Sequence, residues 1–149
     1  MINPPSLVLD TNVVLDWLVF RDPRVGVLSQ WFSERRMRWL ATPAMHQEFM
    51  HVLARPGMQA WEPDLEAVGR AWTDHAHIVP AAAAAPWRCR DTSDQMFVDL
   101  AAAHRVQALL TRDRSLLALA RRARASGLLI GAPERWIGTQ QSAGDAAAR

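Results

Sequence analysis

The chain has no lysine and no tyrosine, and it has one cysteine among its 149 residues. The absence of lysine excludes an ordinary phosphate-binding P-loop, because that motif uses a lysine to reach the phosphates. Cys89 has no second cysteine with which to form an internal disulfide. The chain also has no apolar run close to the roughly 18 residues of a membrane span. Its first residues, Met-Ile-Asn-Pro-Pro, lack the basic and apolar regions of a signal peptide. These absences predict a soluble cytoplasmic protein with no membrane association.

Arginine supplies all of the basic charge. The 17 basic residues give a net charge of only +2. The sequence pI of 9.9 overstates this excess, since without lysine and tyrosine little titrates between neutral pH and the arginine range. Arginines gather at 35 to 38, 112 to 114 and 121 to 124. These groups fit two alternatives, contacts to nucleic-acid phosphates or solvated helix faces.

Short apolar segments alternate with segments of helical periodicity. Half of the residues are hydrophobic, which at this length predicts one domain with a real core. The apolar segments predict strands at 6–11, 38–42, 77–79, 108–111 and 128–130. Helices are expected after each of the first four strands and at about 25–35 and 63–75. The pattern predicts an α/β fold in which a parallel sheet is covered on both faces. We expect the domain to occupy residues 1–137 and a polar, flexible tail to occupy 138–149.

Four acidic residues occupy places where a folded chain could bring them together. Asp10 and Asp113 follow predicted strands, whereas Glu48 and Asp94 lie on the apolar faces of predicted helices. Each has a simpler explanation: Asp10 and Asp113 as turn or cap residues, Asp94 as a charge favoured by the helix dipole, and Glu48 as a residue at the edge of its stripe. Asp99 should point away from the apolar face into solvent. Because buried carboxylates repel one another, four together predict a site for Mg²⁺ or Mn²⁺ that acts on phosphate groups.

Four sequence strings carry a resemblance to a known family. They are Val-Leu-Asp-Thr-Asn at 8–12, Thr-Pro-Ala-Met-His-Gln-Glu at 42–48, Cys-Arg-Asp-Thr-Ser-Asp-Gln-Met-Phe at 89–97 and Leu-Thr-Arg-Asp-Arg-Ser-Leu-Leu at 110–117. In this order the strings resemble the PIN-domain family. The chain is most similar to the branch of toxin components of bacterial toxin–antitoxin systems, the VapC-type ribonucleases. The resemblance implies a three-layer α/β/α sandwich with a central parallel sheet and Mg²⁺- or Mn²⁺-dependent cleavage of RNA.

By motif position, the resemblance assigns both catalysis and metal binding to four acids, with one or two ions held directly or through water. These residues are Asp10, Glu48, Asp94 and Asp113. It assigns supporting positions to Asn12 and Thr111, and Asp91 is expected to cap a helix or support the site. A cognate antitoxin protein and a homodimer are the partners that it implies, with RNA as the substrate. The chain departs from the family pattern at Arg112, often a glycine, and at Ser115, often an aspartate.

Two other functions fit part of the pattern. A phosphatase of the haloacid dehalogenase type also begins with an acid at a strand end, but it needs a second aspartate where this chain has Asn12, and it needs a lysine. A catalytically inactive PIN-like module that binds nucleic acid or acts as a scaffold is the alternative from another class. The complete set of four acids favours the enzyme. Arg112 has two alternative roles, contact with a substrate phosphate or neutralisation of Asp113.

Overall fold

Five parallel strands form the centre of the molecule. The computed structural model describes residues 4–148, and its strands are β1 (Ser6–Leu9), β2 (Arg38–Ala41), β3 (Ala76–Ile78), β4 (Ala108–Leu110) and β5 (Leu129–Gly131). Their order in the sheet is β3-β2-β1-β4-β5, and every neighbouring pair is parallel. All residues of β1 and β4 are buried, as expected for central strands covered on both faces. The five strands predicted from apolar runs are confirmed.

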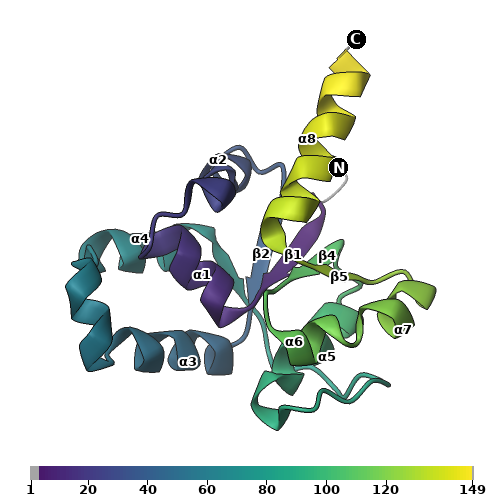
Figure 1. The fold of residues 1–149 in the computed structure, drawn as a ribbon, viewed down its shortest axis with the longest axis horizontal. Coiled ribbons are helices and arrows are strands. Elements are labelled where there is room, and N and C mark those ends of the chain that lie inside the picture. Colours follow the sequence, from purple (N-terminus) through teal and green to yellow (C-terminus); the bar gives the residue numbers. More distant parts are fainter. Residues whose placement is uncertain (1–3, 149) are drawn as a thin grey trace.

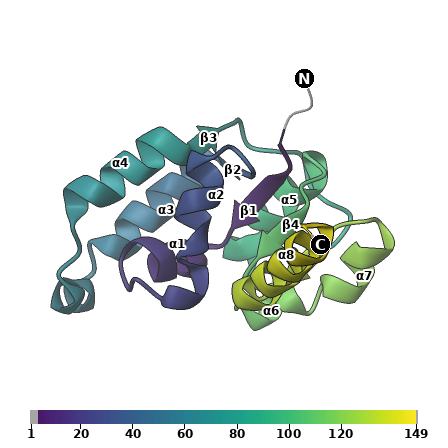
Figure 2. The same ribbon diagram turned by 90° about the horizontal axis from the view of Figure 1, so that it is seen from above.

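Helices cover both faces of this sheet, as Figure 1 shows. One side carries α1 (Thr11–Leu18), α2 (Val27–Ser33), α3 (Pro43–Leu53) and α4 (Leu65–His75), and the other carries α5 (Gln95–Ala103), α6 (Arg114–Leu117) and α7 (Ala120–Ala125). The final helix, α8 (Pro133–Ala148), extends away from the sheet and contacts the turn at Pro23–Val25, and in the view from above in Figure 2 it lies in front of the sheet. Short 3₁₀ turns are η1 (Pro23–Val25), η2 (Pro56–Trp61) and η3 (Thr92–Asp94). The predicted three-layer α/β/α sandwich is confirmed.

Aromatic side chains fix helices against the first side of the sheet. Trp39 of β2 is only 1% exposed and lies between Trp17 of α1 and Trp72 of α4, at ring-centroid distances of 5.4 and 4.4 Å. Large rings of this kind supply much of the apolar area that a domain of this size can bury. These tryptophans therefore act in packing, and their arrangement sets the positions of α1 and α4.

The carboxyl ends of β1, β2 and β4 lie at one edge of the sheet. Asp10 continues from β1, and its backbone N–H donates to the Leu110 carbonyl at 3.0 Å. Helix α3 starts from the same edge after β2, where the Thr42 hydroxyl accepts the Met45 N–H at 3.3 Å and Pro43 occupies the first helical position. This N-cap confirms the predicted start of the helix that carries Glu48.

The structure differs from the sequence-based expectation in two places. The single helix expected at 114–125 is two helices, α6 and α7, separated by a turn in which Leu119 is buried. Residues 138–148 continue α8, where the sequence predicted no helix, and the flexibility expected of this segment stays a prediction. Trp136 and Ile137 anchor the first turn of α8, with Trp136 packed edge-on against Trp31 at 5.9 Å, and the alanine-rich segment beyond can propagate the helix from that turn. A domain boundary at residue 137 stays a prediction, and residue 149 lies outside the described residues.

Across residues 4–148, no helix combines the length and the apolarity that crossing a bilayer requires.

Replacing the cap of α3 tests the link between this local signal and the fold. We expect Thr42→Ala to lower the free energy of unfolding by about 1 kcal/mol, since it leaves an N–H at the helix start without its side-chain acceptor. Urea denaturation measures the change. Thr73→Ala in the exposed face of α4 is the matched control, and it should cost nothing because alanine favours a helix interior. Equal losses in both variants would contradict the capping role.

Candidate active site

Asp10 and Thr111 meet at the carboxyl ends of the two central strands. Asp10 is 3% exposed and Thr111 is fully buried, and the Thr111 hydroxyl donates to Asp10 Oδ2 at 2.7 Å. The same hydroxyl oxygen accepts the Asp113 N–H at 3.0 Å. Thr111 therefore fixes the Asp10 carboxylate and the backbone of Asp113 together. This geometry places the predicted supporting threonine in direct contact with a predicted site acid.

Asp94 and Asp113 lie close enough for each carboxyl group to shift the pKa of the other. Asp94 ends η3 just before α5 and is 9% exposed. Burial is the largest cause that raises the pKa of Asp94 to about 8, and its interaction with the Asp113 carboxyl group and the charges of Asp10, Asp113 and Asp91 add to it. The pKa of Asp113 is lowered, chiefly by its interaction with Asp94 and also because the Ser115 N–H and hydroxyl donate to it. In the absence of metal, a proton on Asp94 thus relieves the repulsion between the two groups.

Glu48 reaches the same region from α3. Its carboxylate accepts a hydrogen bond from the Thr11 hydroxyl at the start of α1. Its charge and that of Asp113 both contribute to raising the pKa of Asp10, although burial is the largest cause of that shift and the Thr111 bond opposes it. Because such charge effects fall off with distance, Asp10, Glu48, Asp94 and Asp113 form one electrostatic cluster. The four acids singled out from sequence lie together.

The cluster is not a preformed metal cage. Within residues 4–148, no three histidine, cysteine, aspartate or glutamate side chains already converge as ligands of one ion. The donor chemistry nevertheless fits Mg²⁺ or Mn²⁺, because every group is a carboxylate oxygen and hard cations prefer such ligands. A cation would also neutralise the charges that the Asp94 proton neutralises in this structure. In the chemistry of their donor atoms, the residues present therefore fit a divalent ion.

Three further residues with a sequence-based expectation have different outcomes in the structure. Asn12 is exposed, and none of the side-chain hydrogen bonds in the described part of the chain involves it, so its supporting role stays a prediction. Asp91 caps η3 by accepting the Ser93 N–H and hydroxyl at 3.0 and 2.7 Å. The expectation that Asp99 is solvated is wrong: it is half-buried and accepts the Ala85 N–H at 2.8 Å. The helical periodicity gave the direction of Asp99, but it did not predict the loop that folds over this side chain.

Thr11 and Ser115 are site neighbours that sequence reasoning missed. Thr11 lies within the Asp-Thr-Asn string, but its bond to Glu48 spans 37 residues of the chain and no local pattern predicts it. Ser115 holds Asp113 Oδ1 through its N–H and its hydroxyl at 2.8 and 3.0 Å. The signal for Ser115 was available, since a serine two residues after an aspartate is typical of an Asx turn.

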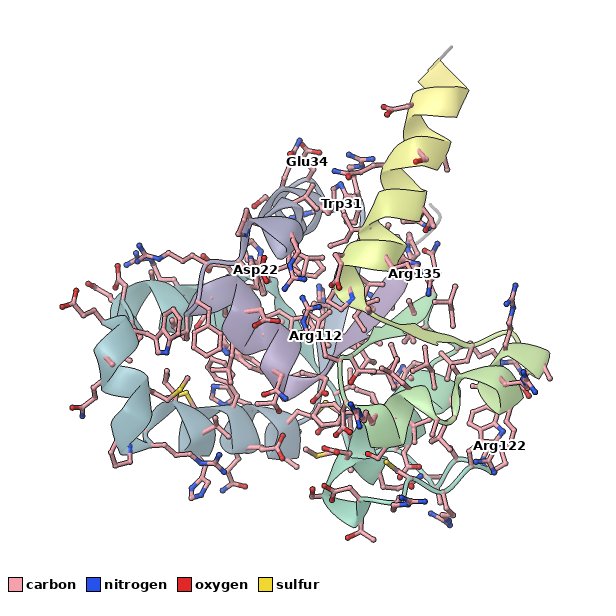
Figure 3. All side chains as sticks on the ribbon, viewed as in Figure 1. Asp22, Trp31, Glu34, Arg112, Arg122 and Arg135 are labelled. Atoms are coloured by element: carbon pink, nitrogen blue, oxygen red, sulfur yellow. The ribbon has the colours of Figure 1, made fainter. Side chains whose placement is uncertain are left out.

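Arg112 does not neutralise Asp113, because its ion pairs lie elsewhere, and its contact with a substrate phosphate stays a prediction. Figure 3 shows it where α1, the turn containing Asp22 and the start of α8 come together. Its guanidinium is 2.9 Å from Asp16 Oδ2, 2.5 Å from Glu134 Oε2 and 3.8 Å from Asp22 Oδ2. Arg24 also pairs with Asp22 and Glu134, at 2.7 and 3.6 Å. Arg112 therefore links three elements to the strand end that carries Thr111 and Asp113, and its charge is directed away from Asp113.

A family comparison agrees with this arrangement. The PIN domain model matches residues 6–115, which include β1 to β4 and all four acids. The chain belongs to the PIN-domain family. PIN domains are in general nucleases, and those nucleases typically use divalent metals, so the carboxylate cluster of this PIN domain lies where a nuclease centre is expected. No curated protein matches the chain.

The raised pKa of Asp94 makes the stability of the metal-free PIN domain depend on pH. An unfolded aspartate has a pKa of about 3.9, whereas the folded value is about 8. The folded state therefore binds more protons between these values, and its unfolding temperature should rise as pH falls from 9 to 6. Thermal unfolding with chelator present measures this dependence.

Asp94→Asn should flatten that rise, because asparagine has no proton to gain. Asp74→Asn removes one exposed carboxylate outside the cluster and should leave the rise intact. An unchanged pH dependence in the Asp94→Asn variant would contradict the assignment to Asp94.

The Arg112 network should contribute to the stability of the PIN domain. Arg112→Met leaves Asp16 and Glu134 without this charge partner. We expect a loss of about 2 kcal/mol, between the roughly 0–1 kcal/mol of surface pairs and the 3–5 kcal/mol of fully buried ones. Urea denaturation provides the measurement, with Arg70→Met, which breaks an exposed 3.8 Å pair with Glu66, as the control. A loss no larger than that of the control would show that the network is only a surface feature.

Proposed function

We propose that this PIN domain is a divalent-metal-dependent endoribonuclease that hydrolyses phosphodiester bonds in RNA and serves as the toxin of a bacterial toxin–antitoxin pair. The single observation that carries the catalytic part is the gathering of three aspartates: the Thr111 hydroxyl joins the Asp10 carboxylate to the Asp113 backbone at the strand ends, and Asp94 lies close enough for both acids to raise its pKa. A fold rarely brings buried carboxylates together without a compensating charge, and in nucleases that charge is a metal ion.

Each residue of the cluster has a role in this proposal. Asp10, Asp94 and Asp113 hold the ion or ions, directly or through water. Glu48, held by Thr11, ligates an ion or orients the attacking water. A bound Mg²⁺ or Mn²⁺ supplies a Lewis acid that polarises the phosphate and makes water easier to deprotonate. Thr111 keeps the Asp10 carboxylate and the Asp113 backbone in place throughout, since its hydroxyl contacts both.

Arginines near the cluster support a polyanionic substrate. Arg114 follows Asp113 directly, and Arg88 and Arg90 lie on either side of Cys89, whose sulfur is 3.2 Å from Ser115 Oγ. All three arginines are exposed, and none forms an ion pair with an acid of the described residues. Exposed guanidinium groups bind phosphates bidentately, and this chain has no lysine to share that task. RNA rather than DNA is proposed from the family resemblance.

The biological setting is proposed from the same resemblance. A cognate antitoxin protein would block the acidic cluster, with an arginine that reaches the carboxylates, and the nuclease would act in the cytoplasm as a homodimer. The cluster suits an antitoxin arginine, because it would present several carboxylates to one guanidinium.

Cleavage of end-labelled RNAs by the purified protein tests the catalytic proposal. Structured and unstructured RNAs, and DNA of the same sequence, are incubated with Mn²⁺, Mg²⁺ or chelator. We expect cuts in RNA only with metal, and we expect Asp94→Asn to reduce the rate by more than about 100-fold, since loss of a ligand should exceed the roughly 10- to 100-fold effect of losing a residue that only orients one. Asp74→Asn is the control and should cleave normally.

The alternative is a PIN-like module that binds nucleic acid or acts as a scaffold without chemistry. It predicts RNA binding that is independent of divalent metal and unchanged by Asp94→Asn, with no cleavage of any substrate. Calorimetry with Mn²⁺ separates the two functions further, because the nuclease must bind the ion and lose that binding in Asp94→Asn. Absence of both cleavage and metal binding would contradict the nuclease and favour the module.

A further inference from the structure

The loop between β3 and η3 is tied to the helix that follows the candidate site. Gln95 Oε1 accepts the Cys89 N–H at 2.6 Å, and Gln95 Nε2 donates to the Trp87 carbonyl at 2.9 Å. Asp99, one turn further along α5, accepts from Gln95 Nε2 and from the Ala85 N–H, both at 2.8 Å. Two side chains of α5 therefore hold residues 85–89 in place. Because α5 begins directly after Asp94, this part of the loop is fixed relative to the site.

Cys89 lies in the part of the loop that α5 holds in place, and it contacts Ser115, whose side chain bonds to Asp113. Cys89 is 5% exposed, and its sulfur lies 3.2 Å from Ser115 Oγ, a distance at which the thiol can donate to the hydroxyl. Ser115 Oγ in turn lies 3.0 Å from Asp113 Oδ1 and can only donate to that carboxylate. The thiol as donor and the carboxylate as acceptor thus set the rotation of the hydroxyl. A continuous chain of hydrogen bonds runs from α5 through the loop to Asp113.

The two Ser115 bonds to Asp113 have different consequences. The backbone N–H donates to Oδ1 at 2.8 Å and would do so with any residue at this position, because it is the ordinary cap of α6. The hydroxyl bond depends on the serine side chain. Both bonds end on the same oxygen, so together they fix the plane of the carboxyl group. The hydroxyl is thus the part that can be removed without removing the cap.

We propose that Ser115 is a positioning residue for Asp113, and that Cys89, held by the Gln95–Asp99 pair, fixes the Ser115 hydroxyl. This inference rests on the proposed function for its effect on metal binding, whereas the positioning itself does not require a metal. A carboxylate held in one orientation binds an ion without first losing rotational freedom. The loop between β3 and η3 therefore contributes to the metal affinity of the site indirectly, through Cys89 and Ser115.

Substitutions that keep or remove the hydroxyl test the proposal. Ser115→Ala should weaken Mn²⁺ binding by about 10- to 100-fold in calorimetry, the range typical of residues that orient a ligand. Ser115→Thr keeps a hydroxyl and should restore binding to within about threefold of the original protein. Cys89→Ala should weaken binding in the same direction by less, and Cys89→Ser, which retains a donor, should rescue it. In cleavage assays, Ser115→Ala should lose rate at low Mn²⁺ and recover it at saturating Mn²⁺.

Ser93→Ala is the matched control. Ser93 donates its N–H and its hydroxyl to Asp91 Oδ1 in the same two-residue geometry, but Asp91 is exposed and outside the four-acid cluster. This variant should bind Mn²⁺ as the original protein does. Thermal unfolding of every variant separates a loss of positioning from a loss of folding.

Crystals of the metal-free variants give a readout that needs no metal. Asp113 should keep one carboxyl orientation in the original protein and in Ser115→Thr, and it should lose that orientation in Ser115→Ala. An unchanged Asp113 in Ser115→Ala, or unchanged Mn²⁺ affinity in that variant, would overturn the proposal. Failure of the original protein to bind Mn²⁺ would instead contradict the proposed function, and the orientation of Asp113 in the crystals would still decide the positioning role.

Discussion

The parallel pairing of β1 with β4 is the constraint on which the rest of the structure depends. The pairing aligns Leu9 with Leu110 and continues into the bond from the Asp10 N–H to the Leu110 carbonyl. As a result Asp10 and Thr111 extend from the sheet side by side, and the Thr111 hydroxyl can bond to the Asp10 carboxylate. The carboxylate of Asp10 is costly to bury, so the apolar strands beneath it must supply the compensating stability.

Two groups of acids in this molecule resolve their repulsion in different ways. Asp16, Asp22 and Glu134 surround Arg112, with Arg24 beside them, and their charges are balanced within the protein. Among the described residues no arginine pairs with the cluster around Asp94, and the proton that the raised pKa of Asp94 favours relieves its repulsion instead. An internally balanced group can only stabilise the fold, whereas a group balanced by an exchangeable proton can accept a cation. The second group is therefore the one available for chemistry.

Hydroxyl groups hold three of the four acids of the candidate site. Thr111 holds Asp10, Thr11 holds Glu48 and Ser115 holds Asp113. A hydroxyl can donate to a carboxylate without adding charge, so it orients the acid and leaves its affinity for a cation intact. An arginine in the same position would compete with the ion. The direction of Arg112 away from Asp113 is consistent with this division of roles.

Local patterns in the sequence were sufficient for the strands, the Thr42 cap and the burial of Asp94, because periodicity, capping preference and apolar spacing act over a few residues. They were insufficient for Asp99, whose direction was right but whose covering loop arrives from elsewhere in the chain, and for residues 138–148, where packing of Trp136 nucleates a helix. Local patterns could not predict the partners of Arg112 either, because Asp16 lies 96 residues away from it along the chain.

The sequence by itself determined the order of strands and helices and which acids would lie on buried faces or at strand ends. Only the tertiary structure decided which hydroxyl holds which carboxylate, where Arg112 points, and that its neighbours raise the pKa of Asp94. The physical reason is distance along the chain. Hydrogen bonds and charge interactions act over a few ångströms, and the residues that make them here become neighbours only after the sheet and its helices have assembled.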